Sequence, residues 1–195
     1  MTELEIKTNL ERNRKEILEL LGQVTRPGIE KLIKWLENSD FFTAPASTRF
    51  HSNYEGGLAE HSLNVYRIFK ERCKHYEFNL SDESIIITAI LHDICKVNFY
   101  EVSSRNTKKD GKWIQVPFYK VNDQMPLGHG EKSVFIINSF IKLTMEEVYA
   151  IRGHMGGYDD NPNVPGGCWE KCKWAVCLHT SDLEASYMFE KHIEY

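Results

Sequence analysis

The sequence lacks any apolar run long enough to cross a membrane, and this absence limits where the protein can work. A spanning helix needs about 20 predominantly apolar residues, whereas the most apolar stretch here covers only residues 85–91. Residues 1–5 are acidic and hold no apolar core segment, so they do not resemble a secretory signal. We therefore expect a cytoplasmic protein that has no membrane partner.

The sequence also lacks regularly spaced cysteines and an excess of positive over negative charge. The five cysteines are an odd number without the rhythm of a disulfide framework, which is typical of a protein from a reducing compartment. The net charge of −4 argues against broad nucleic-acid binding through bulk electrostatics, although a local basic groove is compatible with it. A chain of 195 residues with this mixed composition is expected to fold as one domain with a single core.

Helical periodicity dominates what is present. Apolar residues recur every three or four positions over residues 3–21 and after Pro27, which predicts two packing helices within residues 1–45. Further helices are expected over about 58–76, from 82 through the apolar stretch, and over 131–143, 144–152 and 169–191. β-prone runs on both sides of Asp110-Gly111 predict a hairpin at about 97–121, near the mouth of a site. The expected fold is all-α, one domain over residues 1–195 whose helical core spans 50–190 and carries this small inserted β-hairpin.

A histidine and an aspartate follow directly on the most apolar helix. Residues 85–91 are almost wholly apolar, so the helix should be buried on most sides, and His92-Asp93 stand at its end. Burying an ionised carboxylate costs several kcal/mol (order of magnitude) unless a partner compensates for it. A divalent metal would compensate the charge and use both groups as ligands. The alternative is that the helix end is exposed and that His92 and Asp93 are ordinary solvated residues.

Two other helices each place a polar side chain in an apolar stripe. His61 lies in the stripe of the helix that begins near residue 58, where a hydrogen-bonded core histidine is the simpler alternative. Asp182 lies in the middle of the last expected helix, so helix capping cannot explain it, and either a metal or a buried arginine must pair with it. Three helices therefore offer possible metal ligands.

The order His61, His92-Asp93, His129, His154, Asp182 resembles the HD-domain superfamily of metal-dependent phosphohydrolases, an all-helical fold named for its adjacent His-Asp pair. The resemblance covers about residues 50–186 and is densest in 56–63, 91–96 and 181–185. The first of these segments is also similar to the HD domains of bacterial 3′–5′ exoribonucleases. Those enzymes carry an N-terminal OB-fold, to which nothing in residues 1–45 corresponds.

The resemblance implies a set of ligands and the number of ions. A lysine three residues after the aspartate, here Lys96, is common in members that have two extra histidines and a binuclear centre. Met155 departs from the pattern, because close relatives often have a histidine there. One or two ions of Mn, Fe, Co, Ni, Zn or Mg would suit a mixed histidine and carboxylate site. The implied core ligands are His61, His92, Asp93 and Asp182, and His129 and His154 match the additional pair.

The resemblance also implies a reaction on a small phosphate ester, which we expect to be a nucleotide. A metal-bound water would attack phosphorus, and Lys96 would neutralise charge on the phosphoryl oxygens. Asp93 would bridge the ions or orient the water. Basic candidates for further phosphate contacts, each of which could instead be a solvated surface charge, are Arg49, Arg105, Lys108, Lys109 and Arg152. Candidates for stacking on a base are Tyr158, Trp113 and Tyr119, although aromatic residues in a hairpin usually form local cross-strand pairs.

Two other functions remain open. A 3′–5′ exonuclease-like phosphodiesterase acting on single-stranded nucleic acid would need a basic track, which the net acidity disfavours. A non-catalytic nucleotide-binding module would have no reason to keep every core ligand. A zinc site at Cys168, Cys172, Cys177 and His179 is rejected, because the spacing matches no usual structural zinc pattern.

Overall fold

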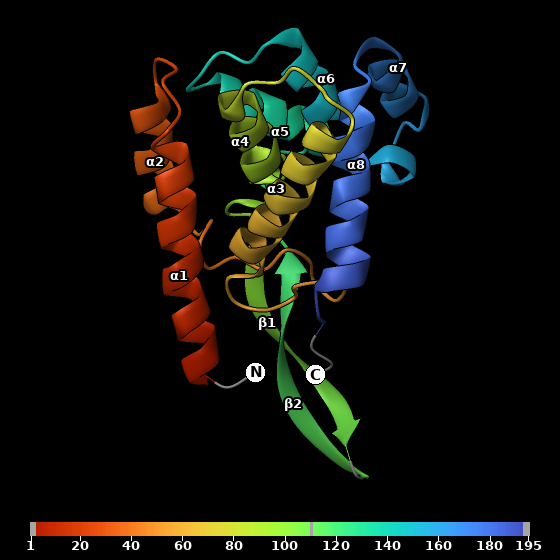
Figure 1. The fold of residues 1–195 in the computed structure, drawn as a ribbon. Coiled ribbons are helices and arrows are strands. Elements are labelled where there is room, and N and C mark those ends of the chain that lie inside the picture. The colour runs from red at the N-terminus through yellow and green to blue at the C-terminus, as the bar shows by residue number, and fades with distance from the viewer. Residues whose placement is uncertain (1–2, 110, 193–195) are drawn as a thin grey trace.

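The computed structural model describes residues 3–109 and 111–192, and this part of the chain forms eight α-helices and one β-hairpin (Figure 1). This arrangement confirms the predicted all-α fold with a small inserted hairpin. Among the described residues, no helix combines the length and the apolar character that a bilayer span requires. The helices are α1 (Glu3–Leu21), α2 (Ile29–Glu37), α3 (Gly57–His75), α4 (Asp82–Leu91), α5 (His129–Asn138), α6 (Met145–Gly153), α7 (Asn163–Lys171) and α8 (Trp174–Glu184), and the strands are β1 (Tyr100–Lys109) and β2 (Lys112–Val121).

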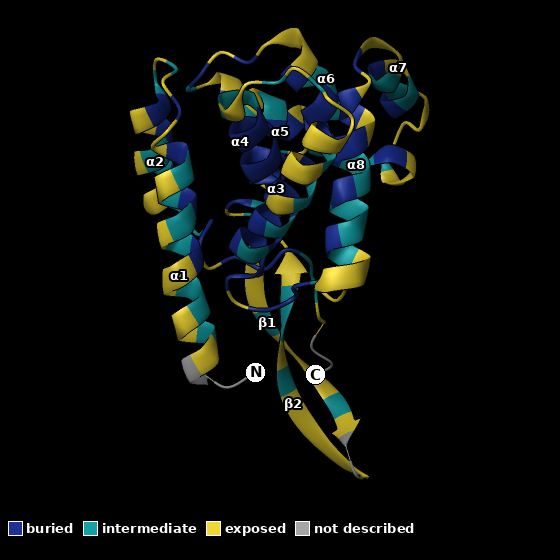
Figure 2. Cartoon of the chain, viewed as in Figure 1, coloured by how far each residue is buried: buried dark blue, intermediate teal, exposed yellow. Residues whose placement is uncertain are grey.

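Helix α4 is the centre of the core. Every residue from Ile85 to Leu91 is buried, and α1, α3 and α6 pack around it (Figure 2). The Ser81 hydroxyl accepts a hydrogen bond from the Ser84 backbone N–H and so caps the start of the helix. The helix ends at Leu91 with His92 as its C-cap residue, and a short 3₁₀ turn over Ile94–Lys96 follows. The polar residues 92, 93 and 96 therefore lie close together, directly after the C-terminal end of α4.

The N-terminal helices are tied to this core by a partly buried ion-pair network. The capping box at the start of α6 is present, with Thr144 and Glu147 bonded reciprocally. The Glu147 carboxylate also accepts two hydrogen bonds of 2.6 Å from Arg26, and Arg26 donates to Glu83 at 2.8 Å. One arginine between α1 and α2 therefore joins the first turns of α4 and α6.

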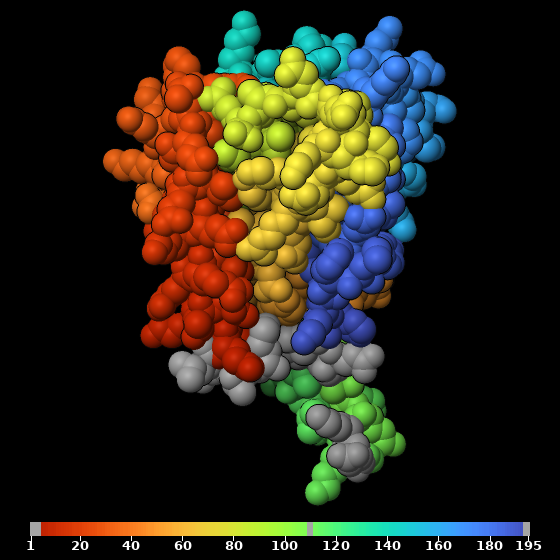
Figure 3. All heavy atoms as spheres, in the orientation of Figure 1, coloured from red at the N-terminus to blue at the C-terminus, as the bar shows by residue number. Residues whose placement is uncertain are grey.

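The hairpin projects beyond one end of the helical body (Figure 3) and is mostly exposed (Figure 2). Its strands pair antiparallel from Tyr100 opposite Val121 to Lys109 opposite Lys112. The strands join between Lys109 and Lys112, within the segment predicted to turn, and Gly111 has the positive φ of +79° that such tight turns favour. Asp110 itself lies outside the described residues.

Two predicted helices differ from those observed. The single helix expected over 169–191 is wrong: α7 ends at Lys171, α8 begins at Trp174, and a π-helical turn over Ala185–Phe189 follows. The helix is interrupted at Cys172, whose backbone is extended, so two helices occur where the apolar spacing predicted one. The helix expected over 131–143 begins at His129 and ends at Asn138, whose side chain accepts a hydrogen bond from the Leu143 backbone N–H.

Candidate metal centre

Four helices and the turn after α4 bring six predicted ligands into one cluster. His61 lies on the second turn of α3, and His92 and Asp93 follow α4. His129 is the first residue of α5, His154 follows the last residue of α6, and Asp182 lies near the end of α8. The ligand atoms of these residues form overlapping groups within 4.8 Å of one another, and such groups could hold a metal ion.

Asp93 lies at the middle of the cluster, and its two oxygens face different partners. Oδ2 lies 3.5 Å from His61 Nε2 and 3.7 Å from His92 Nε2. Oδ1 lies 2.6 Å from His129 Nε2 and 3.4 Å from His154 Nε2. One carboxylate therefore faces a pair of imidazoles with each of its oxygens.

Three imidazoles are held at Nδ1, so that Nε2 points into the cluster. His92 Nδ1 donates to the Ala89 carbonyl at 2.8 Å, and His154 Nδ1 donates to the Ile151 carbonyl at 2.5 Å. His61 Nδ1 lies 2.9 Å from a carboxylate oxygen of Glu190. Because a carbonyl can only accept, Nδ1 of His92 and His154 must carry the proton, and Nε2 presents its lone pair. Metal-binding histidines are typically fixed in this way.

One unsatisfied nitrogen and the close approach of other ligand atoms in the cluster fit a divalent cation. His154 Nε2 is buried and has no hydrogen-bond partner among the described residues. His61 Nε2 and His92 Nε2 face each other at 3.2 Å, and His61 Nε2 is 3.2 Å from Asp182 Oδ1. A cation would satisfy these lone pairs together, and imidazole with carboxylate suits first-row divalent metals.

The surroundings set the charge of each group. Burial alone would lower the pKa of His61, but Glu190 and Asp182 outweigh it and raise that pKa to about 10. Burial lowers the pKa of His92 to about 4, so this ring stays neutral. The pKa of Asp93 is held well below its usual range, because Lys96 and the neighbouring imidazoles outweigh the effect of burial. A cation bound here would displace the proton of His61, since metal ligands must be deprotonated.

A cavity of about 490 Å³ opens onto the cluster. Asp93, Lys96, His129 and Asp182 line its wall, and Lys96 Nζ lies 2.6 Å from Asp93 Oδ2. The base of the hairpin reaches the same cavity through Tyr100 and Val121, near the mouth as predicted. The exposed aromatic side chains that line this cavity are Phe50, Tyr158 and Tyr187.

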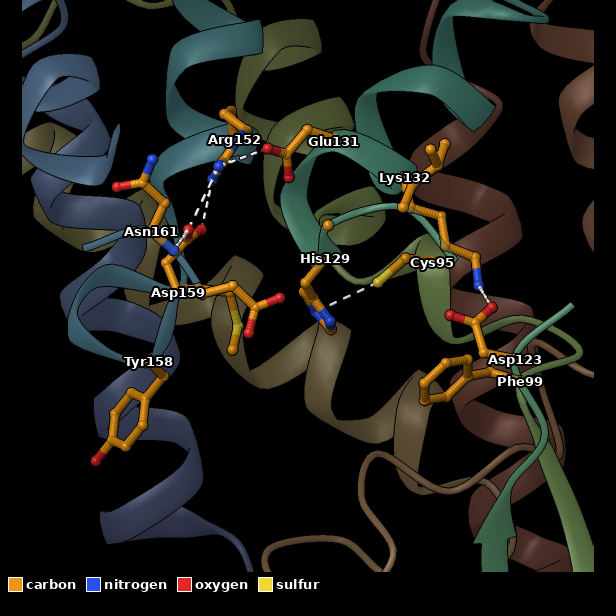
Figure 4. Close-up of a pocket in the computed structure, with 14 residues that line it drawn as sticks. Cys95, Phe99, Asp123, His129, Glu131, Lys132, Arg152, Tyr158, Asp159 and Asn161 are labelled. Atoms are coloured by element: carbon orange, nitrogen blue, oxygen red, sulfur yellow. Dashed lines mark hydrogen bonds and ion pairs between the residues drawn. The ribbon is translucent and has the colours of Figure 1, made fainter. Parts of the chain in front are cut away.

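A second cavity of about 360 Å³ lies against His129 (Figure 4). It shares His129, Met155 and Tyr158 with the first cavity. Arg152, a predicted phosphate contact, lines this second cavity and is bound there by Asp159 and Glu131, each at 2.5 Å. The charge of Arg152 is thus neutralised by two carboxylates.

The other predicted substrate residues lie at different distances from the cluster. Tyr158 is exposed and its hydroxyl lies 3.1 Å from that of Tyr187, at the rim of both cavities. Arg49 is exposed beside the Phe50 ring. The remaining candidates belong to the hairpin: Arg105, Lys108, Trp113 and Tyr119, and Lys109, whose side chain lies outside the described part of the structure.

Two residues at the cluster were missed from the sequence. Glu190 contacts His61 Nδ1 as described, and it also lies 2.7 Å from His51 Nδ1. His51 belongs to the irregular stretch before α3, and Glu190 fell at the end of the helix wrongly expected over 169–191. Nothing in their spacing links positions so far apart, so only the folded chain could pair them.

Comparison with known proteins identifies a family and a relative. The family model described as the HD domain matches residues 58–186. A protein of Methanocaldococcus jannaschii named dihydroneopterin 2′,3′-cyclic phosphate phosphodiesterase is 36% identical over 89 residues, which are 43% of this chain and 34% of that protein. The aligned segment thus spans about a third of the relative's length. No solved structure gives a significant match.

Proposed function

The chain belongs to the HD-domain family, and on this premise we propose that it is a metal-dependent phosphohydrolase that cleaves a phosphoester bond of a nucleotide or a similar small heterocyclic phosphate. The observation that carries the proposal is Asp93, which lies between two pairs of imidazoles on the wall of an open cavity. The name of the partial relative, a cyclic phosphate phosphodiesterase, supports the same chemistry.

The six clustered residues would hold one or two divalent cations. When bound, these cations supply a water acidic enough to attack phosphorus near neutral pH. Asp93 would keep the two sides of the cluster at a fixed separation, because each of its oxygens faces a different pair of imidazoles. His92 and His154 would bind through Nε2, since backbone carbonyls hold their Nδ1 protons.

Lys96 would act on the phosphoryl group. Burial alone would lower the pKa of its ammonium, but Asp93 outweighs burial and raises that pKa, so Lys96 is a cation. It lines the cavity beside Asp93 and can donate to a phosphoryl oxygen as negative charge develops there. Phe50, Tyr158 and Tyr187 at the same cavity offer aromatic faces to a heterocycle.

Single-stranded nucleic acid is a second candidate substrate, favoured by one observation. The hairpin starts at the cavity and carries exposed Arg105, Lys108 and Trp113 away from it. Basic and aromatic side chains together suit a single strand. Comparing the hydrolysis of a dinucleotide with that of a longer oligonucleotide separates the two substrates: a small-molecule enzyme prefers the former.

The test of the proposed function is elemental analysis of the purified protein with an assay of phosphodiester hydrolysis. We expect about two metal ions per chain, since each oxygen of Asp93 faces its own pair of imidazoles, and we expect hydrolysis that a chelator removes. His154→Ala should leave about one ion, because only one side of Asp93 loses its buried imidazole. Absence of metal after reconstitution with each candidate ion, or metal without hydrolysis of any phosphoester, would contradict the proposal.

A further inference from the structure

Glu190 is a buried carboxylate that four polar groups contact. Oε1 lies 2.9 Å from His61 Nδ1 and accepts from Asn64 Nδ2 at 3.2 Å. Oε2 lies 2.7 Å from His51 Nδ1 and accepts from the Ser52 hydroxyl at 2.8 Å. The carboxylate side chain is 0% exposed. A fully buried carboxylate with this many partners is held in one place by its surroundings.

Both flanks of the matched domain meet at this carboxylate. Residues 51, 52 and 190 lie outside the segment 58–186 that matches the HD family. The Ser52 backbone N–H donates to the Lys191 carbonyl at 2.7 Å, which fixes the loop before α3 to the segment after α8. The π-helical turn Ala185–Phe189 ends with the Glu190 N–H bonded to the Ala185 carbonyl at 3.0 Å, and this bond turns Glu190 toward His61.

His61 is therefore held differently from the other two buried imidazoles. His92 and His154 donate to carbonyls of their own helices, three residues earlier in the chain. His61 uses a carboxylate that comes from the other end of the domain. A carboxylate on the outer nitrogen fixes the tautomer and the ring orientation, and it makes the inner nitrogen a stronger ligand.

We propose that Glu190 is a positioning residue that holds His61 in its metal-binding orientation, so that the chain after α8 completes the metal centre. The inference rests on the proposed metal site and adds to it a residue from outside the matched domain. It also explains why a carboxylate that lines neither the first nor the second cavity is buried against the cluster.

The test compares Co²⁺ binding by the metal-free full chain with that of Glu190→Ala and Glu190→Gln. Co²⁺ serves as the probe because its visible absorption reports the ligand geometry. Glu190→Ala should weaken Co²⁺ binding about 10- to 100-fold and alter the spectrum. Glu190→Gln should recover part of the affinity, since its amide oxygen can still accept from His61 Nδ1. Glu184→Gln is the matched control, because it removes a carboxylate at the end of α8 whose ion-pair partner is Arg72 and not a histidine of the cluster.

Two results would overturn the proposal. In the first, both Glu190 variants keep the wild-type Co²⁺ affinity and spectrum, and only their thermal stability falls. Glu190 would then only anchor the C-terminal segment to the domain and would have no role in metal binding. Equal losses in Glu190→Gln and Glu184→Gln would show a general disturbance of α8. If the wild-type chain itself binds no Co²⁺, the proposed function fails, and that result is distinct from a variant-specific loss. Helical circular dichroism confirms that each variant is folded.

Discussion

The buried part and the rim of the metal cluster differ in exposure and in how their side chains are held. The buried part consists of His61, His92 and His154, each 0% exposed. The rim consists of Lys96, His129 and Asp182, whose side chains are 13%, 25% and 19% exposed and line the larger cavity. Asp93 contacts both parts. If the proposed function holds, the buried part would mainly fix the ions, and the rim, which contributes His129 and Asp182 as ligands, would also meet substrate.

Asp93→Ala removes a carboxylate that contacts both parts of the cluster, so it should have the largest effect on metal binding and turnover. The variant loses the only carboxylate among the described residues that faces all four clustered imidazoles, so metal retention and turnover should both be abolished while the helical fold is largely kept. Elemental analysis, hydrolysis and circular dichroism check this together. Asp123→Asn is a suitable control, since Asp123 pairs with Lys132 in the second cavity. Wild-type metal content in Asp93→Ala would remove Asp93 from the site.

The second prediction compares the two parts directly through one imidazole from each. His61→Ala should weaken metal binding more than His129→Ala, by at least about a factor of ten, or roughly 1.4 kcal/mol. Water can take the place of the partly exposed His129 ring, whereas removing the buried His61 leaves Glu190 and Asp182 without a shared partner. Titration of the metal-free variants with Mn²⁺ or Co²⁺ measures both. Equal losses would mean that exposure does not distinguish the two parts.

The third prediction concerns the pH dependence of stability and belongs to the buried part. In the metal-free protein the pKa of His92 is lowered to about 4 by burial, whereas the unfolded chain has the ordinary value near 6.5. The unfolded state therefore binds more protons between these values, and stability is lost as pH falls from 6.5 to 4. The contribution of this one group is about 3 kcal/mol.

Chemical denaturation of the metal-free wild type and of His92→Gln across this pH range measures that contribution. The wild type should lose more stability than His92→Gln as pH falls, since glutamine does not titrate. His61 and His129, whose pKa values are raised to about 10, act in the opposite sense: their contribution is present below pH 6.5 and is lost as pH rises through 10. Parallel curves for the two proteins from pH 6.5 to 4 would contradict the assigned neutrality of His92.

Local sequence patterns predicted the elements well where a start or stop signal marks the end of the pattern. Gly22 ends the first helix, Ser81 caps the buried one, and Asp110-Gly111 marks the hairpin turn. The pattern failed over 169–191, because apolar spacing continues through the break at Cys172 and does not record where a backbone leaves the helix. Periodicity reports a face of a helix, and it is a poor guide to its ends.

The sequence alone determined the all-α fold, the hairpin and the ordered set of histidines and aspartates, because each depends on neighbours three or four residues away or on a short motif. Only the tertiary structure decided which nitrogen of each ring faces inward, that Asp93 has imidazoles at both oxygens, and that Arg152 is neutralised by two carboxylates. It also brought Glu190 to His61 across 129 positions. Such contacts join segments that are far apart in the sequence. They are decided by how the elements pack, and the spacing of residues along the chain does not predict them.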